Sequence, residues 1–316
     1  MKAIQVVGFG GPERLEGVDL DLSSPGEFEV LLEVHAAGVG FGDLLQREGA
    51  YVGGPRPPFV PGCEAAGIVR ARGRGVRSLE VGQRVIAVAS GGLYATHAVV
   101  AAEACAPWPL RLGANAAAAL PVSALTALAC LQRLARAQPG ETVWIPAAVG
   151  SLGSTALQIA HCLGLRTIAF ASTLAKRKLA PELGAAAVFS PDALDVAPAP
   201  DVVLDSVGGE FLRGALRRLR PWGRVVCVGC SSGRTEPIDP LQLLHHTRGV
   251  LGFHLRALLE HPGELRQLMV QILDWVGRGL LVPQVAEEYA LEDAGAAQES
   301  LLDRARIGKP VLRIVP

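Results

Sequence analysis

The chain has 316 residues, of which 50% are hydrophobic and 19% are charged. This composition excludes wholesale disorder, and the length is large for one hydrophobic core, so we expect two domains. Thirty basic residues balance thirty acidic ones. Because the formal net charge is zero, no overall field draws the protein to nucleic acid or to an anionic membrane, and we expect no nucleic-acid partner.

The amino terminus predicts a strand over residues 1–7 and lacks the charged and apolar regions of a signal peptide. We expect no apolar run to reach the about 20 residues that span a bilayer. The sequence therefore predicts a cytoplasmic protein without a membrane partner.

Residues 1–115 are expected to form a mostly β domain. Apolar and polar residues alternate over 28–35, a period of two that predicts a half-buried strand. Glycine and proline interrupt such segments, and residues 91–100 have the pattern of a turn followed by another strand.

Residues 143–160 carry the most informative pattern in the chain. An apolar strand ends in a turn that contains Gly150 and Gly153, and a helix of small residues follows. The start of such a helix offers unpaired backbone N–H groups and the positive end of the helix dipole, which together suit a pyrophosphate. Gly150 lets the backbone approach a ligand, and Gly153 lets the helix pack close to the sheet. The glycine pair alone leaves open a plain tight turn.

Short apolar strands and helices alternate after this turn. The strands are expected at 167–171, 187–189, 202–205, 225–229 and 249–253. Continuously apolar strands that alternate with helices are typical of a parallel sheet covered on both faces. The sequence therefore predicts an α/β, doubly wound parallel-sheet domain over residues 116–251.

The tail, residues 252–316, is expected to return to the first domain. Helices are predicted at 262–279 and 291–304, with a short strand between them, and a last strand at 310–315. A ligand cleft between the two domains would follow, since domain boundaries are common ligand sites.

The six cysteines lie in apolar sequence, and most are expected to be reduced core residues: Cys63, Cys105, Cys130, Cys162, Cys227 and Cys230. Cys227 and Cys230 form a CxxC pair on a predicted buried strand that runs into a glycine. A thioredoxin-like site needs a helix N-terminus to lower the thiol pKa, so we favour a structural role over a redox one.

Many residues follow the pattern of one family in the right order. They are Ala36-Ala37-Gly38-Val39, Asp43, Arg47, Gly49, Tyr51, Pro61-Gly62, Glu64, Gly67, Gly82, Arg84-Val85, Ala147-Ala148, Gly150, Gly153, Gln158, Leu183-Gly184-Ala185, Asp205-Ser206-Val207-Gly208-Gly209, Gly223-Arg224 and Gly308-Lys309. The chain thus resembles the medium-chain dehydrogenase/reductase superfamily, in particular its zinc-independent branch of zeta-crystallin-like quinone oxidoreductases and enoyl reductases. The resemblance implies a GroES-like catalytic domain at 1–115, a Rossmann cofactor domain at 116–251 and a return segment at 252–316 that completes the catalytic domain.

The superfamily also includes zinc alcohol dehydrogenases, whose metal ligands are missing here. Their first catalytic cysteine would fall at Gly40, and Cys63 replaces the histidine of their Gly-His-Glu motif. One thiolate cannot make a three-ligand catalytic site, so we expect no metal. Without a Lewis acid, hydride transfer suits a substrate that is already polarised, such as an activated C=C bond or a quinone.

The end of the second predicted strand of the cofactor domain indicates NADPH. Enzymes that prefer NAD place a carboxylate there for the ribose 2'-hydroxyl, and residues 169–178 contain none. Ser172, Thr173, Lys176 and Arg177 could instead hold a 2'-phosphate, and the resemblance places the phosphate-binding lysine at Lys176. The alternative is a solvated basic helix end.

The resemblance implies further cofactor contacts. They come from Gly40, Thr126, Gly150, Ser151, Leu152, Gly153, Ser172, Lys176, Val207, Gly229, Phe253 and Arg304. Thr126 could otherwise be a helix threonine that bonds its own backbone, and Arg304 could be a surface charge. The family often has asparagine where Gly40 stands, so one polar group is lost beside the nicotinamide.

Tyr51 is the predicted catalytic residue. In related enoyl reductases a tyrosine at this Gly-x-Tyr spacing faces the substrate, and here its phenol could donate a proton or hold the carbonyl oxygen. The alternative is a loop tyrosine that packs on the prolines of residues 55–58.

The sequence therefore predicts an NADPH-dependent reductase of an enoyl thioester such as enoyl-CoA, an enone or a quinone. Small Gly40 and Gly42 with apolar Leu44 and Leu45 slightly favour an aliphatic enoyl chain. Two alternatives are an NADPH-binding structural or interaction protein and a relative of the zinc alcohol dehydrogenases. As in relatives, we expect a homodimer formed through an edge strand of the cofactor sheet.

Overall fold

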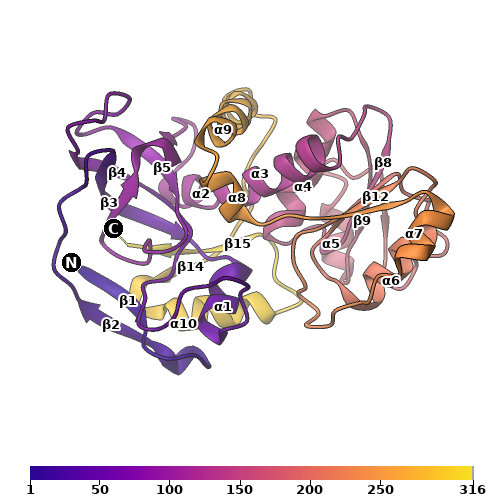
Figure 1. Ribbon diagram of the computed structural model, residues 1–316, viewed down its shortest axis with the longest axis horizontal. Helices are drawn as coiled ribbons and strands as arrows, with labels where there is room; N and C mark the ends of the chain where they lie inside the picture. The colour runs from indigo at the N-terminus through magenta and orange to yellow at the C-terminus, as the bar shows by residue number, and fades with distance from the viewer. Residues whose placement is uncertain (315–316) are drawn as a thin grey trace. The chain divides into compact units, whose positions relative to one another are not determined.

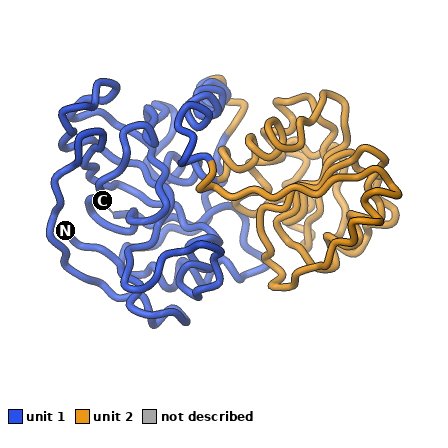
Figure 2. Tube along the Cα trace, in the orientation of Figure 1, with its two compact units in different colours: residues 1–122, 258–277, 282–316 blue, residues 123–257, 278–281 orange. Residues whose placement is uncertain are grey.

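The structure, a computed structural model, describes residues 1–314. The chain forms two compact units (Figure 2). The first contains residues 1–122, 258–277 and the chain from 282 onward, and the second contains 123–257 and 278–281. The tail of the chain therefore lies in the same unit as the amino-terminal segment.

The first unit is built on a seven-stranded sheet and a two-stranded sheet. The large sheet has the order β14-β15-β3-β4-β5-β7, with β6 paired to β3, and the small one pairs β1 with β2 (Figure 1). The strands are β1 Lys2–Val6, β2 Leu15–Asp19, β3 Glu29–Gly38, β4 Glu64–Arg72, β5 Arg84–Val88, β6 His97–Ala101, β7 Cys105–Pro107, β14 Val285–Ala290 and β15 Lys309–Arg313. The helices are α1 Phe41–Glu48, α2 Ala114–Ala118, α9 Pro262–Gly277 and α10 Ala294–Glu299, with 3-10 turns at Pro12–Arg14, Ala102–Ala104, Leu291–Asp293 and Ser300–Leu302.

Two predicted segments of the tail differ from the observed ones. The helix expected over 291–304 is α10 flanked by two 3-10 turns, and it ends by Leu302. The last strand, expected over 310–315, ends at Arg313, and Val315 lies outside the described residues.

Strand β3 lies inside the large sheet and is more buried than its alternating sequence predicts. Val30, Leu32 and Val34 lie in the core of the unit, as a period of two requires. Leu31, on the opposite face, is only 8% exposed. The opposite face is therefore buried at Leu31, whereas Glu33 and His35 on the same face stay about a quarter exposed, as the alternation predicts.

The second unit is a six-stranded, fully parallel sheet of order β10-β9-β8-β11-β12-β13. In chain order this is 3-2-1-4-5-6, the strand order of doubly wound dinucleotide-binding domains, so the predicted fold class is confirmed. The strands are β8 Thr142–Ile145, β9 Arg166–Phe170, β10 Ala187–Phe189, β11 Val202–Asp205, β12 Arg224–Cys227 and β13 Gly249–Gly252. The helices are α4 Ser151–Cys162, α5 Leu174–Leu179, α6 Gly209–Arg218 and α7 Pro240–His246. Two boundaries between the units along the chain fall within two more helices, α3 Pro121–Leu128 and α8 Leu255–Leu259.

Helices cover both faces of the parallel sheet, as its apolar strands require. Figure 1 shows α4 on one side and α6 on the other. Beneath α6, the rings of Trp144 and Phe170 lie 4.8 Å apart and Phe211 packs edge-on against Phe170 at 5.3 Å. Such aromatic contacts join α6 to β8 and β9 in one core.

One expectation about apolar runs is wrong. The helical run Ala114–Leu134, which includes α2, α3 and a π-helical turn at Ala129–Leu134, has 21 residues and a mean hydropathy of 1.6. Its length and composition would suffice to cross a membrane. However, 78% of the 18-residue window that gives this hydropathy is buried inside the protein. A core helix has these properties too, since a helix that is apolar all round is buried in either setting.

A buried ion pair ties three segments of the first unit together. Lys309 on β15 donates to Glu64 at the start of β4, and both side chains are nearly fully buried. The other Glu64 oxygen, Oε2, accepts the backbone N–H of Val122 at 2.8 Å. A Cβ on Gly38 would lie 2.6 Å from Glu64 Oε1, so glycine at 38 makes room for the carboxylate.

Because breaking a buried pair leaves a charge without a partner, Lys309→Met is expected to lower the free energy of unfolding by about 3–5 kcal/mol. Urea denaturation followed by fluorescence measures this. The surface pair Arg70–Glu33, at 2.7 Å, provides the matched control, and Arg70→Met should cost about 1 kcal/mol or less. A cost for Lys309→Met as small as that of the control would contradict a structural role for the pair.

Candidate functional site

The turn that follows strand β8 brings backbone N–H groups to the start of helix α4. Gly150 caps the helix and donates its N–H to Ala147 O at 2.9 Å. A Cβ on Gly153 would lie 2.4 Å from Ala147 O and 2.7 Å from Ala148 Cα. No other residue fits there without moving the turn. The helix start therefore lies close to the strand end, and such an arrangement suits an anion.

The parallel sheet gathers further predicted residues at the same edge. Because all six strands point the same way, the segments after their carboxyl ends lie along one edge of the sheet. These segments hold Gly150, Ser151, Leu152 and Gly153 after β8, Ser172 and Lys176 after β9, Val207 after β11, Gly229 after β12 and Phe253 after β13. The point where strand order reverses lies between β8 and β11, next to the glycine turn. Ligands of doubly wound sheets bind at such a point.

The segment after β9 presents hydroxyl and cationic groups. Thr173 caps the short helix α5, and its side chain accepts the N–H of Lys176 at 3.3 Å. Arg177 donates to the backbone carbonyls of Ala171 and Ser172 at 3.1 and 3.0 Å, so this guanidinium holds the strand end in place. Ser172 is exposed and Lys176 half-buried.

Asp205 organises the segment after β11. Its Oδ1 accepts the backbone N–H groups of Val207 at 2.9 Å and Gly208 at 3.1 Å. Gly208 has a φ of +73°, and a Cβ there would lie 2.8 Å from Cys230 Sγ. Burial raises the pKa of Asp205, while the two N–H groups act in the opposite direction. The carboxylate thus fixes the course of a loop on the sheet edge.

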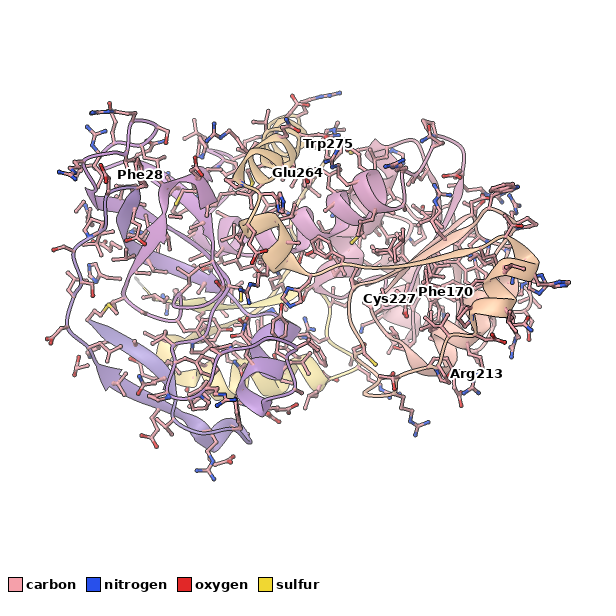
Figure 3. All side chains as sticks on the ribbon, viewed as in Figure 1. Phe28, Phe170, Arg213, Cys227, Glu264 and Trp275 are labelled. Atoms are coloured by element: carbon pink, nitrogen blue, oxygen red, sulfur yellow. The ribbon has the colours of Figure 1, made fainter. Side chains whose placement is uncertain are left out.

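The CxxC pair departs from the expected buried strand. Cys227 ends β12, but Cys230 lies beyond the strand and donates to Arg234 O at 3.0 Å. Burial and the nearby Asp205 raise the pKa of Cys227 to about 11. Phe170 and Cys227, at the ends of β9 and β12, are labelled in Figure 3. A thiol with so high a pKa is a poor nucleophile.

In the first unit, two predicted residues flank helix α1. Gly40 precedes the helix and Tyr51 follows it. Between them, buried Asp43 accepts the N–H of Gly40 at 2.8 Å and the hydroxyl of Tyr94 at 3.1 Å through Oδ2. Burial raises the pKa of Asp43 to about 6, with the charge of Glu64 adding to the shift. The chain therefore places a carboxylate with a near-neutral pKa beside the predicted proton donor.

Cys63 lies against this carboxylate and is part-exposed. Gln46 Nε2 donates to its sulfur at 3.7 Å and to Ser90 O at 3.4 Å. Burial and the charge of Asp43 raise the pKa of the thiol well above its usual value. Within residues 1–314 no three His, Cys, Asp or Glu side chains gather where they could hold a metal ion.

Tyr51 shares this environment. Its ring lies beside the backbone of Gly42, where a Cβ would come within 3.3 Å of Tyr51 Cε2. Burial, Cys63 and Asp43 together raise the pKa of Tyr51 to about 12. The phenol therefore stays protonated throughout the neutral range.

The two remaining predicted residues lie outside α1 and outside the segments that follow the strands of the parallel sheet. Thr126 is half-buried on α3 in the second unit. Arg304 is exposed in the turn that follows the last 3-10 turn of the first unit.

Sequence reasoning gave no role to Asp43, Cys63 or Asp205 within a site. One local signal was present: Asp43 stands three residues after the helix cap Gly40, a spacing at which a side chain can bond the cap N–H. Asp205 likewise ends a strand just before two glycines. Tyr94 gave no local signal, because it reaches Asp43 only through the fold.

Two family models match the chain. Residues 26–110 match the alcohol dehydrogenase GroES-like domain, and residues 151–275 match the zinc-binding dehydrogenase family. The two matches fall largely within the first and second units respectively.

Known proteins match over nearly the whole length. The quinone oxidoreductase of Mus musculus is 32% identical over 99% of this chain and 97% of its own. The quinone oxidoreductase of Thermus thermophilus, solved also in complex with NADPH, is 38% identical over 99% of this chain and 100% of that one, with a TM-score of 0.88. The Escherichia coli quinone oxidoreductase complexed with NADPH is 30% identical over 99% and 100%, with a TM-score of 0.91.

A strand order of 3-2-1-4-5-6, a GroES-like first unit and these full-length matches agree with one another. The chain belongs to the medium-chain dehydrogenase/reductase superfamily, in its quinone oxidoreductase branch.

Proposed function

We propose that this protein is an NADPH-dependent reductase that transfers hydride to a quinone, an enone or an enoyl thioester without zinc. The observation that carries the proposal is the glycine turn at the switch point of the parallel sheet, with Gly153 packed against Ala147. The NADPH complexes of two quinone oxidoreductases with the same fold support the choice of coenzyme.

The residues at the sheet edge fit the coenzyme. The N–H groups at the start of α4 would hold the pyrophosphate, and Ser172 and Lys176 would hold the 2'-phosphate at the end of β9. No carboxylate is present among residues 169–178 to repel it. The bound coenzyme supplies the hydride, and the chain positions it against an acceptor.

Tyr51 is proposed to supply the proton that completes the reduction. With a pKa of about 12, its phenol keeps its proton at neutral pH and can donate a hydrogen bond to the oxygen on which charge develops. When the phenol gives up its proton, Tyr51 takes another from solvent, so the residue is unchanged after each cycle.

Zinc-independent chemistry is supported by the donor set around Cys63. Its sulfur lies against Asp43 and receives the Gln46 amide, and glycine stands at position 40. This set offers one thiol, no imidazole and a carboxylate, Asp43, that already accepts hydrogen bonds from Gly40 and Tyr94, whereas catalytic zinc takes three protein ligands.

The slight preference for an enoyl chain loses part of its support. Leu44, expected to line an apolar pocket, is 1% exposed and lies in the protein interior, and the ring of Tyr51 covers the backbone at Gly42. Gly40 and half-buried Leu45 remain as small or apolar neighbours. We therefore propose quinones and enones on equal terms with enoyl thioesters.

A homodimer is proposed through the edge of the parallel sheet. β13 is an edge strand, and the exposed apolar residues nearby are Trp222, Leu241 and Leu244. The backbone N–H of Trp222 donates to Thr247 O at 2.7 Å, so the Trp222 backbone lies beside the residues that lead into β13. Edge strands and exposed apolar side chains together favour pairing with a second copy. A monomeric mass by light scattering at micromolar concentration would contradict this.

The proposed activity predicts that the protein oxidises NADPH with members of a panel of quinones, enones and enoyl-CoA esters. The same protein is expected to contain less than one zinc ion per chain. Spectrophotometry at the nicotinamide band and metal analysis of the same sample, purified without chelators, measure both. Tight NADPH binding without turnover of any acceptor would favour a binding or interaction role. Zinc at one ion per chain would favour the alcohol dehydrogenase alternative.

Lys176→Ala is expected to weaken NADPH binding about 10- to 100-fold, because one charge-assisted bond to the 2'-phosphate is lost. NADH binding should change little, since NADH lacks that phosphate. Fluorescence titration with both coenzymes measures the ratio. Lys178→Ala, two residues along α5 and exposed, is the matched control and should retain the preference. An equal loss for both coenzymes would refute a 2'-phosphate contact.

Tyr51→Phe is expected to lower kcat about 100-fold with little change in KM, since a positioned acid acts in the transition state. Below about pH 11 the wild-type rate should show no fall assignable to Tyr51, because its pKa is about 12. Steady-state kinetics against pH measures both. Tyr289→Phe, on β14, serves as the control. Unchanged kcat in Tyr51→Phe would remove this residue from the chemistry.

A further inference from the structure

Arg177 makes contacts in the structure that differ from those its place in the sequence suggests. It stands beside Lys176 in the basic segment after β9, where a 2'-phosphate is expected. Instead, its Nη1 atom donates to Ala171 O at 3.1 Å and to Ser172 O at 3.0 Å. A terminal guanidinium nitrogen carries two N–H bonds, so both donors of Nη1 are directed to the backbone.

The three residues that link β9 to α5 are all bonded to Arg177. Its side chain bonds the carbonyls of the first two, and its backbone N–H donates to the carbonyl of the third, Thr173, at 3.0 Å. On the other side, the N–H of Ala171 donates to Phe189 O at 3.0 Å, which ties the linker to the end of β10. A linker held in this way has lost much of its conformational freedom before a ligand binds.

The linker and the first turn of α5 carry the groups that we assign to the 2'-phosphate. The Ser172 side chain is exposed, and the backbone N–H of Lys176 donates to the Thr173 hydroxyl at 3.3 Å. Because the backbone dihedrals limit the rotamers of a side chain, a fixed linker limits the directions in which Ser172 and Lys176 extend. A site that is ordered before its ligand arrives avoids the cost of ordering at binding.

The charge of Arg177 also has a counterpart within the chain. In the segment after β10, the Ser190 hydroxyl donates to Asp192, and this bond lowers the pKa of the carboxyl. The charge of Arg177 acts in the same direction, so the carboxylate lies within electrostatic reach of the guanidinium. The structure thus provides partners for Arg177 that do not include a phosphate.

We propose that Arg177 is a positioning residue for the choice of coenzyme: it fixes the linker so that Ser172 and Lys176 meet the 2'-phosphate, and it does not touch the coenzyme itself. The proposal rests on the proposed function for the presence of the phosphate, and on the hydrogen bonds of the linker for the positioning. Two cations that are adjacent in the sequence therefore have different roles. Lys176 acts on the phosphate through its charge, and Arg177 acts through the backbone.

The first test compares the binding of NADPH and NADH to Arg177→Met by fluorescence titration. NADPH is expected to bind about tenfold more weakly, because the linker must then be ordered at binding, and NADH less than about threefold more weakly, because it lacks the 2'-phosphate. Lys178→Met changes the next residue of α5, which is exposed, and this matched control should bind both coenzymes like the wild type. An equal loss for both coenzymes would overturn the proposed role.

A double-mutant cycle separates positioning from a direct phosphate contact. In a Ser172→Ala/Lys176→Ala background, the groups that Arg177 positions are absent. Arg177→Met is therefore expected to change the NADPH affinity of this background by less than about twofold. A guanidinium that contacts the phosphate would still do so there, so a further loss of about tenfold would refute positioning.

A crystal structure of the wild type with NADPH needs no variant and stands if Arg177→Met does not fold. Both carbonyl bonds of Nη1 are expected to persist, with no nitrogen of the guanidinium within hydrogen-bond distance of the 2'-phosphate. A guanidinium turned onto the phosphate would contradict the proposal.

Hydrogen exchange measured without coenzyme tests the hold on the linker by itself. The peptide that covers residues 171–178 is expected to exchange about tenfold faster in Arg177→Met than in Lys178→Met, because the linker opens more often. Equal exchange in the two folded variants would show that Arg177 does not fix the linker. If the wild type binds no NADPH, the proposed function fails, while this experiment still decides on the positioning.

Discussion

The close approach of helix α4 to the end of strand β8 is the constraint on which the second unit depends. It requires glycine at 153, because a Cβ would lie 2.4 Å from the carbonyl oxygen of Ala147. That approach brings the first N–H groups of α4 to the reversal point of the sheet. The residues assigned to the coenzyme after β9, β11, β12 and β13 lie at the same edge, since parallel pairing carries those loops to it.

In the first unit a single buried carboxylate has a comparable influence. Asp43 fixes the start of α1 through Gly40 and is in turn held by Tyr94. The charge of Asp43 contributes to raising the pKa of the Tyr51 phenol and the pKa of the Cys63 thiol. The buried charge of Asp43 therefore favours the protonated form of the proposed donor, Tyr51.

The strands and the glycine turn of the second unit were predictable from the sequence, because they depend on local patterns. Short apolar runs became β8 to β13 with shifts of one or two residues at their ends. The Gly150 and Gly153 pair marked the helix start, and the lack of a carboxylate after β9 was visible in the sequence itself. Parallel pairing then follows from chain connectivity.

What local patterns could not predict are contacts between distant segments. Asp43 meets Tyr94 across 51 residues, and Glu64 meets Lys309 across 245. Leu44 was expected to line a pocket, but the structure buries it in the protein interior. The sequence of α1 alone does not show which face of the helix packs against the rest of the unit. The run 114–134 was missed because polar residues and a proline interrupt it, although its mean hydropathy is still 1.6: Asn115, Pro121, Ser123, Thr126, Gln132 and Arg133.

The most direct test of the account is a calorimetric titration of NADPH into wild type and Gly153→Val, with Gly263→Ala as control. Gly263 lies in α9 with open space around its Cα, so this variant should bind like wild type. Saturable heat is expected with wild type and the control, and at least tenfold weaker binding is expected when the valine side chain forces α4 away from β8. Wild-type protein that gives no heat, or Gly153→Val that binds as tightly as wild type while folded, would contradict it.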